Sequence, residues 1–261
     1  MGKAQATRRF NDRRVALSVT PIFVPSKGRP NASTIRLLKE SSLQFTVVVE
    51  PQDAERYADA PTAVLEENNK GIAYVRSWIK QNAGKGWYWM LDDDITSFYK
   101  TANGKSIRVD AATALLGSQK YFMGDESVAQ ASLEYQQFAW SSKKPVKYNG
   151  YCDVAVCIHA GRTRFCGYRE EVALKEDRDF TLQVLSCGYR TARVCAFSFA
   201  APKNGSNAGG LQDEYAKVGN EASASLRMCQ LWPGICSPLT KPDGRKDVKI
   251  NWRAITRSNN L

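Results

Sequence analysis

Three consecutive aspartates, Asp92, Asp93 and Asp94, follow directly after the apolar run from Trp87 to Leu91. On an extended backbone, Asp92 and Asp94 point to the same side. Two converging carboxylates repel each other unless a cation lies between them, and Mg²⁺ and Mn²⁺ bind carboxylate oxygens readily. The triplet therefore predicts a divalent-metal site that could hold a diphosphate. The alternative is a solvated acidic turn that caps the next helix.

The segments around this triplet alternate between predicted strands and predicted helices. We expect strands at residues 14–25, 45–50, 63–65 and 87–91, and helices at 32–40, from 51 onward and at 71–81. Strands that are apolar on both faces are typical of parallel sheets covered by helices. The alternation predicts an α/β fold with an open, doubly wound sheet, whose ligands bind outside the carboxyl ends of the strands.

Beyond residue 94 the pattern is looser. We expect a helix at 126–140, a strand at 154–159, a helix at 177–185, a strand at 193–199 and a glycine-rich loop at 202–210. A last helix is predicted by apolar residues at helical spacing, namely Leu211, Tyr215, Val218, Ala222 and Leu226. Gly209 and Gly210 could hinge a flap over a bound ligand, and an inert linker is the alternative.

The formal charge of +11 is concentrated at the two ends of the chain. Residues 1–30 carry seven Lys or Arg and one Asp, and residues 241–261 carry six Lys or Arg and two Asp. Basic arms suit a polyanion because phosphate neutralisation releases counterions. Arms that only keep the protein soluble are the alternative. The candidate nucleic-acid contacts are Arg8, Arg9, Arg13, Arg14, Arg245, Lys246 and Lys249.

The composition excludes several classes of protein. The 261 residues are 43% hydrophobic and 24% charged, which is typical of a globular protein and not of a disordered tail. No window approaches the roughly 18 to 20 apolar residues of a membrane span, so we expect a cytoplasmic protein with no membrane partner. The seven cysteines include no CxxC pair, which favours buried, reduced thiols. The single histidine, His159, leaves no histidine-based zinc or serine-triad site.

Five segments together resemble a known class of enzymes. PSKGRPN, VVVE-P-x-D, GIAYVRSWI, WYWMLDDDI and KEDRDF are similar to motifs of the nucleotide-sugar glycosyltransferases with the GT-A fold. More narrowly, Pro25-Ser-Lys-Gly-Arg-Pro and Trp89-Met-Leu-Asp-Asp-Asp-Ile resemble the TET-associated glycosyltransferases. That family includes phage enzymes and is linked to sugar transfer onto hydroxymethylated pyrimidines in DNA.

The resemblance implies a fold and a division of the chain. The fold is a GT-A-like, Rossmann-type open mixed sheet with helices on both faces and a C-terminal helical extension. The expected parts are a basic arm at 1–13, a GT-A-like catalytic domain at 14–205, and a flexible loop, helix and basic tail at 206–261.

The resemblance also implies roles for single residues. Asp92 and Asp94 match the family's DxD motif, with Asp92 near the donor ribose or the metal and Asp94 on the metal, Mn²⁺ or Mg²⁺. Nucleotide-sugar binding is implied for Ser26, Lys27, Arg29, Glu50, Asp53, Arg76, Asp92 and Asp93. Each role has an alternative. The loop with Ser26, Lys27 and Arg29 could be only a surface turn, and Asp53 could only cap a helix. Arg76 could be an arginine that snorkels from an amphipathic helix.

Glu176 and Asp177 resemble the acidic pair before the acceptor-side helix of inverting members. A carboxylate there can accept the proton of an acceptor hydroxyl that attacks the anomeric carbon, and Asp177 is the candidate base. The alternative is that these acids only stabilise the helix N-terminus.

The resemblance thus implies a metal-dependent, inverting glycosyltransferase that acts on two partners. It moves a sugar from a nucleoside diphosphate sugar, such as a UDP-sugar, to a hydroxymethylated pyrimidine in double-stranded DNA, in the host cytoplasm if the chain is phage-encoded. A polysaccharide, lipid or protein acceptor is the alternative within the same chemistry. Metal-dependent nucleotidyl transfer and an inactive DNA-binding module are the two other classes that the residues leave open.

Overall fold

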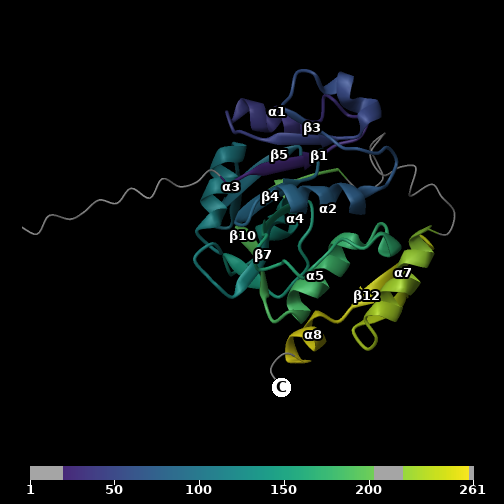
Figure 1. The fold of residues 1–261 in the computed structure, drawn as a ribbon. Helices are drawn as coiled ribbons and strands as arrows, with labels where there is room; N and C mark the ends of the chain where they lie inside the picture. The colour runs from purple at the N-terminus through teal and green to yellow at the C-terminus, as the bar shows by residue number, and fades with distance from the viewer. Residues whose placement is uncertain (1–19, 203–219, 259–261) are drawn as a thin grey trace, which may run out of the picture.

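One large sheet runs through the chain, and helices cover both of its faces (Figure 1). The computed structural model describes residues 20–202 and 220–258. The strand order is β3-β2-β1-β4-β9-β7-β10-β5-β6, and β8 pairs with β10 outside this path. The strands of this sheet are β1 (Ile22–Pro25), β2 (Thr46–Val49), β3 (Thr62–Val64), β4 (Trp87–Leu91), β5 (Ser97–Ala102), β6 (Lys105–Val109), β7 (Val128–Tyr135), β8 (Val146–Tyr148), β9 (Ala155–His159) and β10 (Arg190–Ala200).

The helices lie between these strands and after the last one. They are α1 (Ser33–Glu40), α2 (Ile72–Asn82), α3 (Ala111–Gln119), α4 (Gln136–Ala139), α5 (Glu176–Ser186), α7 (Asn220–Leu231) and α8 (Trp252–Ser258), with 3-10 helices η1 (Pro51–Tyr57) and η2 (Glu170–Val172). A separate hairpin consists of β11 (Cys236–Thr240) and β12 (Lys246–Ile250).

The first half of the sheet is parallel. β1 pairs in parallel with β2 and β4, and β2 pairs in parallel with β3. The sequences of β1, β2 and β4 are IFVP, TVVV and WYWML, and almost every residue in them is buried. This confirms the parallel unit predicted from strands that are apolar on both faces. All four strands end at one edge of the sheet, which we call the carboxyl edge.

The second half makes the sheet mixed. β9 lies between β4 and β7 and is antiparallel to both, while β10 is parallel to β7. β7 and β10 therefore run in the same direction as β4. The ends of β7 and β10 and the segment before β9 all reach the carboxyl edge, beside the acidic triplet that follows β4.

Two apolar cores fix the helices to the sheet. The first core joins α1 and α3 to one face, and the second joins α2 and α5 to the other face. Along β4, Trp89 and Leu91 belong to the first core, whereas Tyr88 and Met90 belong to the second. This alternation confirms the predicted arrangement of helices on both faces of one sheet.

The prediction of a helix at 126–140 is wrong for most of these residues. Residues Val128–Tyr135 form strand β7, and only Gln136–Ala139 are helical. Apolar and polar residues alternate from Ala129 to Tyr135, as in a strand, but Ala, Gln, Leu and Glu are good helix formers, and the polar side chains are buried as well, because β7 lies between β9 and β10. Pairing with two neighbouring strands overrides the local helix propensity.

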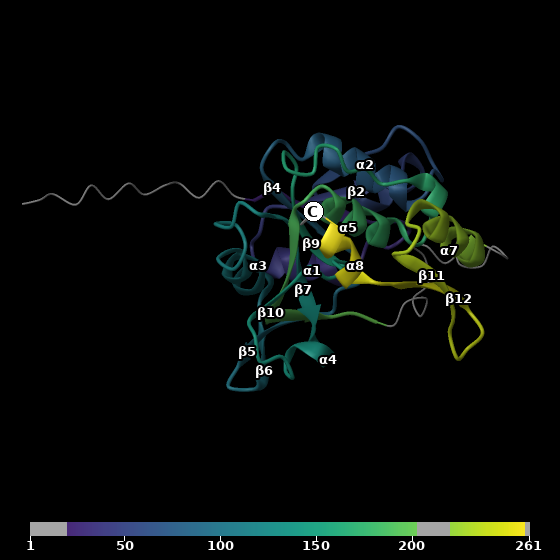
Figure 2. The same cartoon turned by 90° about the horizontal axis from the view of Figure 1, so that it is seen from below.

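The C-terminal residues pack against α5 (Figure 2). Leu182 and Leu185 of α5 share a small core with Met228 of α7, Val248 of β12 and Ile255 of α8. The described part of the predicted last helix is helical, as α7, but the predicted packing face is wrong, because Leu226 is 58% exposed and the buried residues of α7 are Ala224, Ser225 and Met228. The hairpin β11–β12, in contrast, falls in a segment that the sequence analysis treated as a basic tail. Its short strands bury few side chains, one in β11 and two adjacent ones in β12, so they show little periodicity.

Some expected features lie outside the described residues. These are the basic arm 1–13 with Arg8, Arg9 and Arg13, then Arg14, the proposed flap at Gly209 and Gly210, and Leu211, Tyr215 and Val218. The seven cysteines are free thiols, and five of them are buried. None of the helices in residues 20–202 and 220–258 combines the length and apolarity that a membrane span requires.

Candidate active site

The backbone of the acidic triplet forms a turn that α1 holds in place. The hydroxyl of Thr34 donates a hydrogen bond to the carbonyl oxygen of Asp92 (2.6 Å) and accepts one from the amide of Ile95 (2.9 Å). The amide of Thr34 donates to the carbonyl oxygen of Asp93 (3.2 Å). The expectation of an extended backbone through the triplet is therefore wrong, because these residues form a turn.

The three aspartate side chains have different surroundings. Asp93 is buried, whereas the side chains of Asp92 and Asp94 are 33% and 31% exposed. Burial raises the pKa of Asp92 to about 7, the charge of Arg76 opposes this shift, and the charges of Asp94, Asp93 and Asp177 add to it. Asp92 and Asp94 thus lie close enough to repel each other and remain accessible from the carboxyl edge.

The donor set of the triplet fits a hard divalent cation. Among the described residues, no three His, Cys, Asp or Glu side chains converge into a closed metal site. Mg²⁺ does not need such a cage, because one or two carboxylates usually hold it together with water and the phosphates of a substrate. Burial is the main cause of the raised pKa of Asp92, and the repulsion from Asp94 and Asp93 that adds to it is the kind that a bound cation relieves.

Asp93 connects the triplet to the loop after β1. It accepts hydrogen bonds from the hydroxyl of Ser26 (2.6 Å) and the guanidinium of Arg29 (2.8 Å). The hydroxyl of Tyr57 in η1 forms a hydrogen bond with the hydroxyl of Ser26 (2.8 Å) and accepts one from the amide of Arg29 (2.8 Å). Arg29 also lies 3.8 Å from a carboxylate oxygen of Asp94. The loop, predicted to surround a nucleotide, is therefore fixed directly beside the exposed carboxylates.

The loop after β2 braces the same first loop. The carboxylate of Asp53 accepts the amide of Gly28 (2.9 Å) and the guanidinium of Arg56 (3.1 Å), so it does not cap η1. Gly28 has a φ of 70°, a backbone conformation that favours glycine. Lys27 pairs with the buried Glu50 (3.2 Å) and donates to Asn69 (2.7 Å) in the loop after β3. Three loops at the carboxyl edge thus form one polar framework.

Arg76 joins the triplet to the start of α5. Its guanidinium projects from α2 and lies 3.2 Å from Asp92 and 3.5 Å from Glu176, with the ring of Tyr168 5.9 Å away. Only 6% of Arg76 is exposed. Burial raises the pKa of Glu176 to about 7, against the opposing charge of Arg76. The structure therefore places Arg76 between two carboxylates, where it positions them.

Asp177 lies at the same helix start and is only partly buried. Its carboxylate accepts hydrogen bonds from the hydroxyl of Tyr151 and from the amide of Arg178 (2.7 Å). The Tyr151 ring has the guanidiniums of Arg178 and Arg193 within 5.5 and 5.7 Å and stacks on Trp252 of α8. The candidate base is thus held by a tyrosine that three neighbouring side chains fix.

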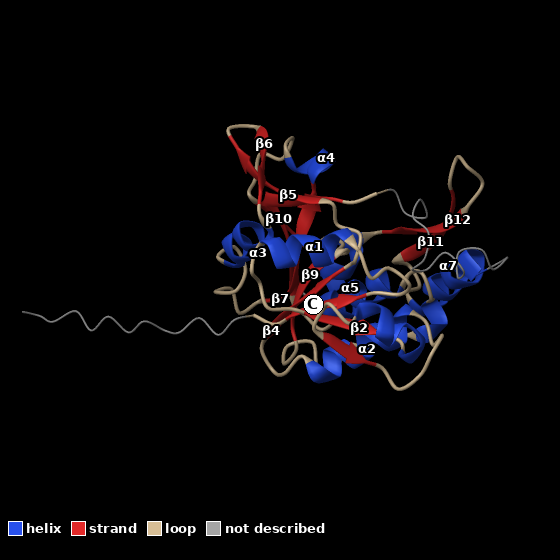
Figure 3. Ribbon diagram, turned by 90° about the horizontal axis from the view of Figure 1, so that it is seen from above, coloured by secondary structure: helices blue, strands red, loops and turns tan. Residues whose placement is uncertain are grey.

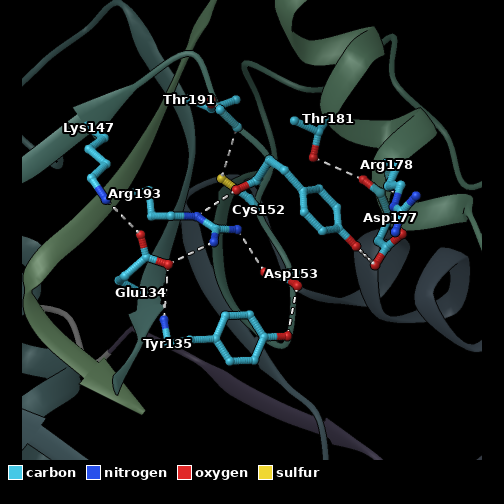
Figure 4. Close-up of polar contacts among 12 residues, drawn as sticks. Glu134, Tyr135, Lys147, Cys152, Asp153, Asp177, Arg178, Thr181, Thr191 and Arg193 are labelled. Atoms are coloured by element: carbon cyan, nitrogen blue, oxygen red, sulfur yellow. Dashed lines mark hydrogen bonds and ion pairs between the residues drawn. The ribbon is translucent and has the colours of Figure 1, made fainter. Parts of the chain in front are cut away.

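A second buried network lies beside Asp177 (Figure 4). Arg193 of β10 forms ion pairs with Glu134 at the end of β7 (2.9 Å) and with Asp153 before β9 (2.8 Å). Asp153 also accepts the hydroxyl of Tyr135 (2.9 Å). Arg193 further donates to the backbone oxygen of Tyr151 (2.8 Å). This network fixes the segment before β9 against β7 and β10.

Sequence reasoning did not identify these residues. Glu134 and Tyr135 fell within the incorrectly predicted helix, so their position at a strand end was hidden. A carboxylate at the end of a buried strand was the available signal for Glu134, as it was for Asp92. Asp153 precedes the predicted strand at 154–159 and carried no motif.

The structure brings together most of the residues that the sequence analysis singled out. The residues linked around the carboxyl edge are Ser26, Lys27, Arg29, Glu50, Asp53, Arg76, Asp92, Asp93, Asp94, Glu176 and Asp177. The candidate DNA contacts of the hairpin, Arg245, Lys246 and Lys249, are exposed and lie on or next to β12.

Solved structures with the same fold were found by comparison. S. aureus TarS 1-349 has a TM-score of 0.52 and 13% sequence identity, and the match covers 80% of this chain and 65% of that chain. TarS 1-349 in complex with UDP has a TM-score of 0.51 and 14% identity, and the match covers 80% of this chain and 65% of that chain. TarS 1-349 in complex with UDP-GlcNAc has a TM-score of 0.51 and 13% identity, and the match covers 80% of this chain and 66% of that chain. This chain thus spans about 65% of TarS 1-349, and the likeness confirms the predicted GT-A-like fold.

The sequence itself matches one family. No curated protein matches this chain in sequence. The family model described as TET-Associated Glycosyltransferase matches residues 20–210, which include every strand of the large sheet and all the loops of the carboxyl edge. The chain therefore belongs to the TET-associated glycosyltransferase family.

Proposed function

We propose that the protein is a metal-dependent, inverting glycosyltransferase that moves a sugar from a UDP-sugar to a hydroxymethylated pyrimidine in DNA. The observation that carries the proposal is the grouping at the carboxyl edge. There, two accessible carboxylates, Asp92 and Asp94, lie between a braced cationic loop and a second acidic pair, Glu176 and Asp177.

The donor side of the site consists of the loops after β1, β2 and β3. In an open α/β sheet a nucleotide binds outside the carboxyl ends of the strands, where these loops lie. Arg29 is held beside Asp94 at 3.8 Å and offers a guanidinium that suits a diphosphate. A uridine nucleotide is supported by TarS, which shares the fold and was solved with UDP and with UDP-GlcNAc.

The metal would be held by Asp92 and Asp94, and the proposal names Mn²⁺ or Mg²⁺. Bound there, the ion supplies positive charge that stabilises the leaving diphosphate. The ion pair from Arg76 to Asp92 keeps that carboxylate oriented. The hydrogen bonds from Ser26 and Arg29 turn Asp93 inward, which leaves its two neighbours to face the donor.

Asp177 is proposed as the base. The hydroxyl oxygen of the acceptor attacks the anomeric carbon, its proton passes to the carboxylate of Asp177, and the bond to the diphosphate oxygen breaks with its electron pair. Attack on the face opposite the leaving group inverts the configuration. Tyr151 orients the carboxylate through its hydroxyl, and Glu176 keeps Arg76 in place between the two acidic groups.

DNA as the acceptor is supported by the family to which the chain belongs and by the exposed basic side chains of the hairpin, Arg245, Lys246 and Lys249. A base in a duplex must be reached in a groove or flipped out before its hydroxymethyl group can react. A polysaccharide, lipid or protein acceptor would use the same donor chemistry.

The direct test is incubation of the full chain with a panel of nucleotide sugars, Mn²⁺ and a duplex that contains hydroxymethylcytosine. Mass analysis of the digested DNA should show a nucleoside heavier by one hexose or N-acetylhexosamine, with release of UDP. Transfer only to a non-DNA acceptor would replace the proposed acceptor. Release of pyrophosphate instead of UDP would indicate nucleotidyl transfer and contradict the proposal.

A further inference from the structure

Two large aromatic side chains are exposed just beyond the end of β7. Phe138 of α4 is 53% exposed, and Trp140, directly after α4, is 56% exposed. Large aromatic side chains normally bury most of their surface, so two of them exposed within five residues of a strand end favour a binding surface over a structural role.

The same stretch is strongly basic. Residues 136–148, which we call the α4–β8 segment, contain Lys143, Lys144 and Lys147 and no Asp or Glu. All three lysines are exposed. Lys147 pairs with Glu134 (3.2 Å), whereas Lys143 and Lys144 form no ion pair with any described residue. Two exposed lysines thus follow the two exposed rings within six residues of the chain, and neither forms an ion pair with a described residue.

This segment adjoins the acceptor side of the candidate site. The ring of Phe138 packs edge-on against Tyr135 at 6.3 Å, and the hydroxyl of Tyr135 donates to Asp153 (2.9 Å). The charges of Asp92 and Asp177 act on Tyr135 and Asp153, respectively. Figure 3 shows α4 near β5 and β6, apart from the donor-side helix α2. Phe138 is therefore connected through Tyr135 and Asp153 to the carboxylates of the site, and Trp140 follows it by two residues in the chain.

We propose that the α4–β8 segment binds the DNA strand next to the target base, with Phe138 and Trp140 stacking on bases and Lys143 and Lys144 contacting phosphates. This inference rests on the proposed DNA acceptor and specifies where that acceptor docks. Aromatic rings interleaved with lysines suit a nucleic acid, because every base offers a face for stacking and every linkage a negative charge. Tyr148 is not included, since the guanidinium of Arg190 already covers its ring at 3.7 Å.

The choice of a nucleic-acid strand over an uncharged acceptor follows from charge. A neutral oligosaccharide could stack on Phe138 and Trp140, but it would gain nothing from Lys143 and Lys144. A nucleic-acid strand offers bases to the two rings and one phosphate per nucleotide to the two lysines, so it matches both parts of the surface. The bases beside a flipped target lose a stacking partner, and an aromatic side chain can replace that partner.

The first test replaces the rings. In the full chain, Phe138→Ala combined with Trp140→Ala should weaken binding of a fluorescent hydroxymethylcytosine duplex at least about tenfold. The KM for DNA should rise, while kcat and the affinity for UDP stay unchanged. Phe165→Ala is the matched control, because Phe165 is 78% exposed and follows β9 at the opposite edge of the sheet.

The second test replaces the charges and is independent of the first. Lys143→Glu combined with Lys144→Glu should weaken DNA binding and also reduce its salt dependence, because fewer counterions are released. The alanine variants of the rings should leave the salt dependence unchanged. Lys85→Glu is the control, because Lys85 is exposed in the turn before β4, at the opposite edge.

The outcomes separate this inference from the proposed function. If the wild type transfers sugar to DNA and both sets of variants bind DNA as tightly as the wild type, the inference is overturned and the proposed function stands. If the variants lose affinity for an oligosaccharide but not for DNA, the surface has another occupant and the inference is also overturned. If the wild type neither binds nor modifies DNA, the proposed acceptor and this inference both fail.

Discussion

Each aspartate after β4 has a distinct environment, and the differences suggest distinct roles. Asp93 is enclosed by Ser26 and Arg29, which leaves it to hold the first loop against the triplet. Asp92 receives the guanidinium of Arg76 on one side and faces Asp94 on the other. Asp94 keeps nearly a third of its side-chain surface exposed, which suits direct contact with a cation. A motif of three identical residues thus contains two accessible carboxylates and one structural carboxylate.

Asp94→Asn should abolish metal-supported turnover while the fold remains intact. The amide keeps the size of the side chain but removes its negative charge, so the site loses one of the two proposed anionic ligands. We expect kcat/KM for the UDP-sugar to fall at least roughly 100-fold, comparable to loss of other electrostatic stabilisation at a transition state. The thermal midpoint should match that of the wild type. Asp59→Asn, at an exposed position two residues after the end of η1, is the control. A variant at Asp94 with wild-type turnover would exclude the metal role.

Tyr151→Phe should lower kcat with little effect on the KM for the donor. The substitution removes only the hydroxyl that donates to Asp177, and hydrogen bonds to charged groups contribute about 1.5–3 kcal/mol. A fall in kcat of roughly tenfold or more is therefore expected. Steady-state kinetics at saturating donor and acceptor measure the effect. An unchanged kcat would mean that Tyr151 does not position the base.

The residues that face the site could be predicted from the sequence, but their partners could not. Asp92, Asp94 and Arg29 stand beside turn residues and strand ends, so a local pattern identifies them. Thr34, Tyr57 and Arg193 act only because the fold brings them to a distant residue: Thr34 and Asp92, for example, are 58 positions apart. No local property of these three residues indicates such a contact.

At the scale of elements, the C-terminal hairpin is tied to the start of α5. The buried carboxylate of Asp247 in β12 accepts Arg178 (2.8 Å), Lys175 (3.1 Å) and Lys241 (2.8 Å). Lys175 and Arg178 flank the acidic pair of the candidate site in sequence. Burial alone would raise the pKa of Asp247, but the hydrogen bond from Lys241 and the charges of Arg178 and Lys175 hold it well below its usual range. The hairpin therefore positions the helix that presents Asp177.

Asp247→Ala should destabilise the protein strongly. Removing one partner of a buried ion pair leaves the other charges without compensation and typically costs about 3–5 kcal/mol. Urea unfolding of the full chain measures the loss. Asp243→Ala is the control in the same hairpin, since its pair with Arg245 is exposed and should contribute less than about 1 kcal/mol. Equal stabilities for the two variants would show that Asp247 does not secure the hairpin.

The elements were predictable to different degrees for a physical reason. β1, β2 and β4 consist of continuous apolar residues, and the helices between them have amphipathic spacing, so the parallel half follows from the sequence. β7 contains residues that favour helices in isolation, and only its two neighbouring strands make it extended. In β12 two consecutive residues, Asp247 and Val248, are buried. This pattern matches neither the alternation of a strand nor the spacing of a helix, so the sequence does not indicate the strand.

For the whole molecule, the acidic groups around Arg76 couple stability to pH. Burial raises the pKa of both Glu176 and Asp92 to about 7, whereas both groups titrate near about 4 in an unfolded chain. Between these values the folded protein binds more protons than the unfolded chain. The contribution of these groups to the free energy of unfolding therefore falls as pH rises from about 4.5 to about 7.

Glu176→Gln should flatten this dependence. The amide cannot ionise, so up to about 1.4 kcal/mol per pH unit is removed from the slope in metal-free buffer. Urea unfolding at a series of pH values from 5 to 8 would show the change. Glu170→Gln is the control, because Glu170 is exposed at the start of η2. If the wild type and Glu176→Gln have the same slope, Glu176 does not hold a proton in the folded state.

The central claim concerns the carboxyl edge as a whole: Asp92 and Asp94, the loop from Ser26 to Arg29 and the framework behind them form a metal-supported nucleotide diphosphate site. The most direct measurement is calorimetric titration of UDP into the full chain with and without Mn²⁺, for the wild type and for Asp94→Asn. The account predicts that Mn²⁺ strengthens UDP binding to the wild type at least roughly tenfold and has little effect on the variant. Equal UDP affinity under all four conditions would contradict it.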